Sequence, residues 1–170
     1  MAQLNFLSPP ASSNQATASS SHWTLFIDGA SRNNPGPAGA GFYVLKDSEV
    51  FAQEGYFLGS KTNNQAEYLA LIVGLAFVQK HIDSKDTLRV VSDSQLVVRQ
   101  LLGEYRVKNL ALKPLFLLAH DMIKKNNAHV MHVLRTENTH ADEMANVGID
   151  KKKPVPSFVK KLLEKHAISL

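Results

Sequence analysis

The chain has 170 residues, of which 44% are hydrophobic and 20% charged, and its formal net charge is +4. This length and balance predict one globular domain with a full core. Cysteine is absent, which excludes disulfides and thiolate metal sites, and no apolar run reaches the roughly 18 residues of a membrane span. We expect a cytoplasmic monomer without a membrane partner, whose mildly basic charge suits a polyanionic ligand.

The N-terminal stretch, residues 1–21, is rich in Ser, Ala, Pro and Asn and contains no charged side chain. This composition predicts a disordered segment. A secretory signal would need a basic start and a longer apolar run, and a transit peptide would need arginines, so neither is expected here.

Residues 22–150 show the periodicity of a compact domain. In chain order, we expect strands and helices as follows: strands at Trp23–Asp28, Gly41–Lys46 and Val50–Phe57; a helix at Thr62–Lys80; a strand at Thr87–Ser92; helices at Ser94–Leu102 and Leu110–Lys125; a strand at Ala128–Leu134; and a helix at Asn138–Val147. The Gly/Pro/Asn-rich stretch Asn33–Gly41 is expected to be a turn region.

The order of these elements predicts an α/β fold. The first three strands follow one another closely, which favours antiparallel pairing, whereas the later strands alternate with helices, which requires parallel pairing and crossovers. We expect a mixed five-stranded sheet with helices on both faces. Local signals support the boundaries: a polar turn at Asp47–Ser48, a capping box formed by Thr62 and Gln65, and a C-terminal glycine at Gly103.

Residues 151–170 form a basic tail. Two prolines are followed by the amphipathic segment Ser157–His166, which has apolar residues at positions 158, 159, 162 and 163. We expect a helix packed on the domain. A contact for nucleic acid or a protein partner is the alternative.

Four dispersed acidic residues stand in positions where one site could gather them. Asp28 and Asp93 each end an apolar run, Glu67 falls in the first turn of a predicted helix, and Asp142 lies early in a later helix. A carboxylate at the end of a buried strand is costly unless its charge is offset. Because ligands of such sheets gather at the carboxyl ends of the strands, we expect these acids to converge on divalent cations.

The absence of cysteine and the supply of carboxylates favour Mg²⁺ or Mn²⁺ over Zn²⁺. Two such ions about 4 Å apart serve phosphodiester chemistry. The alternative is structural: the chain has 15 Asp and Glu residues, Asp93 is placed to be an N-cap, and Glu67 would gain from the helix dipole.

Four stretches carry a resemblance to a known family. DGASRNNPGPAGAG, TNNQAEYLAL, SDSQLVV and NTHADEMAN occur in this order, and together they resemble ribonuclease H of type 1 over Trp23–Ile149. The resemblance implies the ribonuclease H-like fold and hydrolysis of the RNA strand of an RNA–DNA hybrid, leaving a 3′-hydroxyl and a 5′-phosphate, with two Mg²⁺ ions for which Mn²⁺ could substitute. Asp28, Glu67, Asp93 and Asp142 match the family's four catalytic, metal-binding acids, with Asp28 as the bridging ligand and Asp142 nearer the attacking water.

The same motifs imply contacts with the hybrid. The candidate substrate-binding residues are Gly29, Asn34, Thr62, Asn63, Asn64, Gln65 and Gln95. Asn34 and Thr62 would help to hold a DNA-strand phosphate, Gln95 would contact the RNA strand, and the crowded amides would reach minor-groove edges and 2′-hydroxyls. The alternative for these short polar residues is turn formation and capping, and Ser94 is expected to begin a helix rather than act as a nucleophile.

The sequence departs from many relatives at two places. The region between Val133 and Asp142 is short and lacks a flexible Gly/His loop, so Arg135, Glu137 and His140 are each open as residues lining the site. The extra basic helix that grips the hybrid in some relatives is missing. A smaller basic surface is available from Arg99, Arg106, Lys108 and Lys113.

Two other functions fit the same pattern less well. One is a catalytically inactive hybrid or nucleic-acid binding module of the same fold, which has no physical reason to keep all four acids. The other is an integrase- or resolvase-like nuclease, which typically shows a different spacing of acids.

Overall fold

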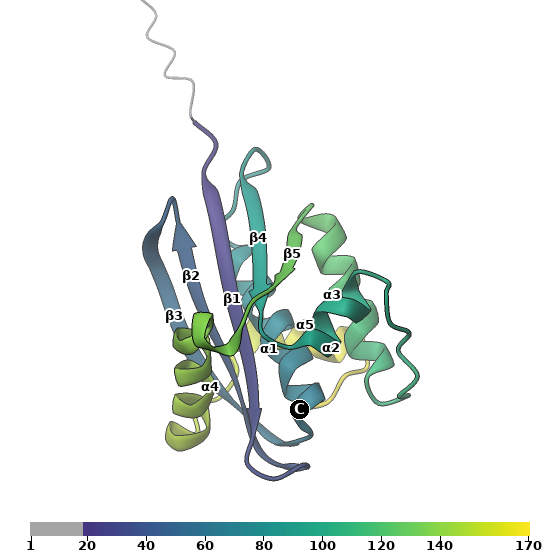
Figure 1. Ribbon diagram of the computed structural model, residues 1–170. Helices are drawn as coiled ribbons and strands as arrows, with labels where there is room; N and C mark the ends of the chain where they lie inside the picture. Colours follow the sequence, from purple (N-terminus) through teal and green to yellow (C-terminus); the bar gives the residue numbers. More distant parts are fainter. Residues whose placement is uncertain (1–18) are drawn as a thin grey trace, which may run out of the picture.

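The computed structural model describes residues 19–170, so the predicted disordered segment 1–21 lies outside the described residues except for its last three. In chain order the elements are β1 (His22–Ser31), β2 (Gly36–Lys46), β3 (Glu49–Lys61), α1 (Asn63–Val78), β4 (Thr87–Ser92), α2 (Gln95–Leu101), α3 (Lys113–Lys125), β5 (His129–His132), a 3₁₀ turn (Arg135–Glu137), α4 (Thr139–Lys151) and α5 (Ser157–Lys165) (Figure 1).

The five strands form one mixed sheet in the order β3-β2-β1-β4-β5. The β1–β2 and β2–β3 pairs are antiparallel, and the β1–β4 and β4–β5 pairs are parallel. Helices cover both faces: Gly74 of α1 packs on Leu25 and Ile27 of β1, whereas α4 lies on β2 and β3 from the other side (Figure 1). The predicted α/β architecture is confirmed.

The antiparallel strands are longer than predicted. The stretch expected to be a turn region, Asn33–Gly41, belongs mostly to β2, and only residues 32–35 remain as the turn. Its Gly and Pro content indicates a turn locally, but the ladder pairs Ser31 with Ala38 and Gly36 with Lys61. Cross-strand pairing therefore overrides the local preference, as it does in many strands.

Three predicted boundary signals are present. Asp47 and Ser48 have φ values of 50° and 69°, the two positive values of a type I′ hairpin turn. Thr62 caps α1 through a complete capping box with Gln65. Gly103, just beyond α2, has φ of 78°, which suits glycine after a helix.

Helix α4 rests directly on the backbone of β2 and β3. A Cβ atom at Gly55 would lie 1.8 Å from the carbonyl oxygen of Met144, and one at Gly41 would lie 2.3 Å from that of Ala141. No side chain fits between strand and helix at these points. Glycine therefore sets how closely α4 approaches the sheet.

We expect Gly55→Ala to lower the free energy of unfolding by about 2–4 kcal/mol, because the new methyl group forces α4 away from the sheet. Thermal unfolding in EDTA measures this loss. Ser60→Ala, an exposed change on the same strand, is the control and should leave the melting temperature within about 1 °C. Equal melting temperatures for the two variants would contradict the close packing.

The C-terminal residues pack against the domain. The backbone N–H of Phe57 donates to the carbonyl of Lys153 at 2.7 Å, so the chain after α4 runs beside β3. Val159 and Leu163 of α5 then join the main hydrophobic core. The boundary expected after residue 150 falls in the last turn of α4. Among residues 19–170, no helix has both the length and the apolar character needed to cross a membrane.

Candidate active site

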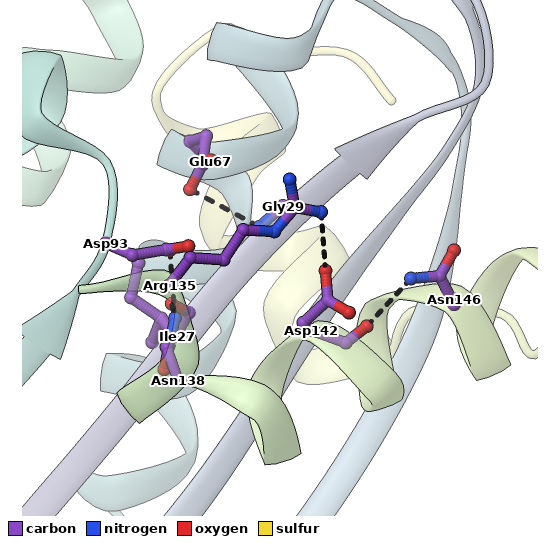
Figure 2. A network of polar contacts seen from close by, with 8 residues as sticks. All are labelled: Ile27, Gly29, Glu67, Asp93, Arg135, Asn138, Asp142 and Asn146. Atoms are coloured by element: carbon purple, nitrogen blue, oxygen red, sulfur yellow. Dashed lines mark hydrogen bonds and ion pairs between the residues drawn. The ribbon is translucent and has the colours of Figure 1, made fainter. Parts of the chain in front are cut away.

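All four singled-out acids border one cleft of about 280 Å³. One carboxylate oxygen from each of Asp28, Glu67 and Asp93 lies within 4.8 Å of the others. Asp142 lines the same cleft, and Figure 2 shows it on α4, across from Glu67 on α1. The fold therefore brings together acids as far apart in the sequence as Asp28 and Asp142, which are separated by 114 positions.

The sheet explains why the two aspartates meet, although only Asp93 directly follows its strand: β1 continues past Asp28 to Ser31, beyond the end expected from the sequence, because its ladder with β2 extends that far. β1 and β4 are parallel neighbours, and Ile27 lies opposite Ser92. Asp28 and Asp93 follow Ile27 and Ser92 in the sequence, so the two aspartates lie at the same level of the sheet. Asp93 is not the N-cap of α2, because that position is taken by Ser94, whose side chain accepts a hydrogen bond from the Val97 N–H.

Glu67 differs from the expectation in one respect. It is the fifth residue of α1, so it belongs to the second turn rather than the first. At that depth the helix dipole offers it little, and only 6% of the residue is exposed. Its Oε2 accepts one hydrogen bond at 3.4 Å, from the backbone N–H of Gly29.

Crowding of carboxylates changes their protonation. Burial, followed by the charges of Asp93 and Asp142 and a hydrogen bond with Asp142, raises the pKa of Asp28 to about 8. Burial and the charges of Asp28 and Asp93 likewise raise the pKa of Glu67 well above its ordinary value. Arg135 opposes both shifts, yet one guanidinium does not balance the acids. The cleft therefore favours additional positive charge.

Of the three residues left open by the sequence, Arg135 faces the cleft. Its Nη2 lies 3.4 Å from Oδ1 of Asp142 (Figure 2). Glu137 instead accepts a hydrogen bond from the Leu134 N–H. The His140 ring stacks on Tyr43, with centroids 4.5 Å apart, so its contact is with the sheet.

The predicted substrate-binding residues fall into different environments. Gly29 and Asn63 line the cleft. Asn34 adjoins it, since its Oδ1 accepts a hydrogen bond from the Asn63 N–H at 3.0 Å. Thr62 and Gln65 form hydrogen bonds with each other in the cap of α1, which is the capping role given above as the alternative to substrate binding. The remaining two lie at helix starts outside the cleft lining, with Asn64 half-buried and Gln95 exposed.

The sequence interpretation missed two asparagines beside the acids. Asn138 donates a hydrogen bond to Asp93 Oδ1 at 3.0 Å, and Asn146 donates one to the carbonyl of Asp142 at 3.0 Å (Figure 2). Asn138 stands four residues before Asp142 and Asn146 four residues after it. That one-turn spacing was the available signal.

The donor set fits a hard divalent cation. Three carboxylate oxygens within 4.8 Å of one another, with no thiol in the chain, are the ligands that Mg²⁺ and Mn²⁺ accept. A cation held by these oxygens would favour the ionised form of Asp28 and so oppose the upward shift of its pKa.

Comparison with known proteins places this cleft in a family. Residues 26–148 match a family model described as reverse transcriptase-like. The crystal structure of ribonuclease H1 from the archaeon Halobacterium salinarum is 35% identical, has a TM-score of 0.71, and aligns over 76% of this chain and 98% of that one. The chain belongs to the ribonuclease H type 1 family.

Other ribonuclease H proteins show the same likeness. LC11-RNase H1, whose structure is known in complex with an RNA/DNA hybrid, is 35% identical with a TM-score of 0.70, over 76% of this chain and 97% of that one. A bifunctional protein of Mycobacterium tuberculosis is 39% identical over 126 residues, 72% of this chain. The chain spans less than two thirds of these curated relatives: 34% of the mycobacterial protein and 63% of the Halobacterium ribonuclease HI.

Proposed function

We propose that this ribonuclease H protein is an endoribonuclease that hydrolyses the RNA strand of RNA–DNA hybrids. The observation that carries the proposal is the cleft in which Asp28, Glu67 and Asp93 hold carboxylate oxygens within 4.8 Å of one another. Membership of the family and the hybrid-bound relative LC11-RNase H1 support the choice of substrate. The products would carry 3′-hydroxyl and 5′-phosphate ends.

The four acids would hold two divalent ions, with Mg²⁺ as the proposed cofactor and Mn²⁺ as a substitute. Two ions supply an activated water on one side of the scissile phosphate and stabilise the leaving oxygen on the other. Asp28 suits a shared ligand, because it lies among Glu67 and Asp93 and lines the same cleft as Asp142, whose charge acts on it. Arg135 would orient Asp142 from the solvent side.

The polar rim beside the acids supplies the contacts that distinguish RNA from DNA. Asn63 lines the cleft and is bonded to Asn34, so the β1–β2 turn and the start of α1 present their polar groups together. Short amides can bond 2′-hydroxyls and minor-groove edges, which mark the RNA strand. We propose Asn34, Asn63 and Asn64 for this role, and Thr62 for a DNA-strand phosphate.

The decisive experiment offers three end-labelled substrates with Mg²⁺: an RNA–DNA hybrid, duplex RNA and duplex DNA. We expect cleavage of the RNA strand of the hybrid alone, and analysis of the product ends tests the proposed 3′-hydroxyl and 5′-phosphate. A hybrid that is bound but left intact would favour an inactive binding module. Cleavage of duplex DNA would favour an integrase-like nuclease.

Gel filtration of the same preparation tests the expected monomer.

Affinity for the hybrid should depend only moderately on salt. Within residues 19–170, no helix lies between α2 and α3, so the basic helix of some relatives is missing, and the exposed Arg106 and Lys108 stand in that connection. We expect the double variant Arg106→Ala/Lys108→Ala to reduce the slope of log affinity against log salt by about 1–2. Lys85→Ala, in the turn before β4, is the control. An unchanged slope in the double variant would show that these two side chains do not contact phosphates.

A further inference from the structure

Asn138 is buried at the junction of three segments that carry active-site acids. Only 1% of the residue is exposed. Its Nδ2 donates one hydrogen bond to the carbonyl of Ile27 at 2.9 Å and another to Oδ1 of Asp93 at 3.0 Å (Figure 2). Its own carbonyl accepts from the Asp142 N–H at 3.2 Å.

These contacts reach three of the four acids. Ile27, whose carbonyl accepts one bond, directly precedes Asp28 on β1. Asp93 accepts the second bond with its own side chain. Asp142 lies one helical turn after Asn138. A single residue therefore links β1, the connection after β4 and the first turn of α4.

The chemistry of the neighbours requires an amide. The Ile27 carbonyl and the Asp93 carboxylate both accept hydrogen bonds, so the group between them must donate two, and Nδ2 of Asn138 donates both. A hydroxyl donates once, a carboxylate not at all, and a lysine would add a charge where cations are needed. Within the described residues the Oδ1 atom of Asn138 is buried and has no hydrogen-bond partner.

We propose that Asn138 is a positioning residue, which fixes the orientation of the Asp93 carboxylate relative to Asp28 and so prepares the acids to bind cations. This inference rests on the proposed function for its kinetic readout, but its binding readout needs no substrate. In metal sites generally, residues that hydrogen-bond the ligands orient them without touching the metal. Replacing such a residue typically lowers metal affinity or activity by about 10–100-fold.

The test compares Asn138→Ala and Asn138→Asp with the unaltered protein. Calorimetric titration with Mg²⁺ alone, and separately with Mn²⁺ alone, should show about 10-fold weaker binding for Asn138→Ala. In hybrid cleavage, kcat should fall about 10-fold or more for both variants, with KM within about twofold. Asn138→Asp keeps the shape of the side chain but replaces the donor by a carboxylate oxygen.

Gln100→Ala is the matched control for a purely structural effect. It removes another buried amide, whose Oε1 accepts a hydrogen bond from Tyr68 Oη at 2.7 Å and which is not among the described residues that line the acidic cleft. It should lower the melting temperature in EDTA as much as Asn138→Ala does, yet leave Mg²⁺ binding and kcat unchanged.

Three outcomes would overturn the proposal: unchanged Mg²⁺ binding in Asn138→Ala, unaltered kcat in Asn138→Asp, or equal losses of kcat in Asn138→Ala and Gln100→Ala. If the unaltered protein cleaves no hybrid, the proposed function fails, whereas the Mg²⁺ titrations still decide whether Asn138 prepares the acids for cations.

Discussion

Replacing Asp28 by Asn is expected to reduce cleavage of an RNA–DNA hybrid on the order of 10³-fold or more, because the change removes the carboxylate that lies among the other acids. Binding of the hybrid should be retained, and above about pH 8, where Asp28 is ionised without metal, it should be strengthened, since one negative charge near phosphate is lost. Initial rates with Mg²⁺ and hybrid binding in EDTA measure the two effects. Asp121→Asn, the same chemical change on exposed α3, is the control.

The same substitution should stabilise the metal-free protein at high pH. The pKa of Asp28 is raised from 3.8 to about 8 in the folded chain, so the folded state holds its proton more tightly than the unfolded state. Stability from this group is fully present below about pH 4 and is lost as the pH rises through about 8. In EDTA at pH 9, Asp28→Asn should unfold with a free energy on the order of 1–3 kcal/mol higher than the unaltered protein.

At pH 4.5 that difference should be much smaller, because Asp28 is protonated in the folded protein and the pH is only slightly above its ordinary pKa of 3.8 in the unfolded chain. Addition of Mg²⁺ at pH 9 should stabilise the unaltered protein more than the variant. A variant that is less stable than the unaltered protein at pH 9 in EDTA would contradict the electrostatic picture of the cleft. A variant that keeps its cleavage rate would contradict the proposed role of Asp28.

Truncation after Asp150 is expected to cost at least about 4 kcal/mol of stability, and at 37 °C to prevent cooperative folding. The removed segment buries Val155, Val159, Leu163 and Ile168 in the main core. Each of these side chains contributes about 1.5–3 kcal/mol through burial, and the domain has only about 5–15 kcal/mol in total. Denaturant unfolding monitored by circular dichroism measures the loss.

A point variant keeps this prediction testable if the truncated chain does not fold. Leu163→Ala should lower the free energy of unfolding by about 2–5 kcal/mol. Lys161→Ala, an exposed change on the same helix, should have almost no effect. A truncated chain that melts no earlier than the full chain would favour the alternative of a tail that serves only a partner or nucleic acid.

The tail also lies near the region proposed to bind substrate. Ile168 and Ser169 line a small pocket together with Lys61, at the end of β3, and Gln65, in the first turn of α1. Loss of the tail should therefore loosen the helix start that carries Thr62 and Asn63. This connection was not evident from the sequence, because nothing in residues 151–170 indicates which part of the domain they cover.

Local patterns determined most of the architecture. Hydrophobic periodicity, the capping box at Thr62 and the turn at Asp47 depend on residues a few positions apart, and each is found as predicted. The order of strands and helices then left few topologies, since parallel pairs need crossovers. The acids could be nominated because Asp28 and Asp93 end apolar runs, where an isolated charge is costly.

The tertiary structure alone decided what depends on distant partners. Asn138 bonds Ile27 and Asp93, which are 111 and 45 positions away, so no local window contains the donor and its acceptors. The close approach of α4 to Gly55 and the extension of β2 into a glycine-rich stretch likewise follow from packing between segments. Short-range preferences are encoded within a few residues, whereas burial and hydrogen bonding between remote segments exist only once the chain has folded.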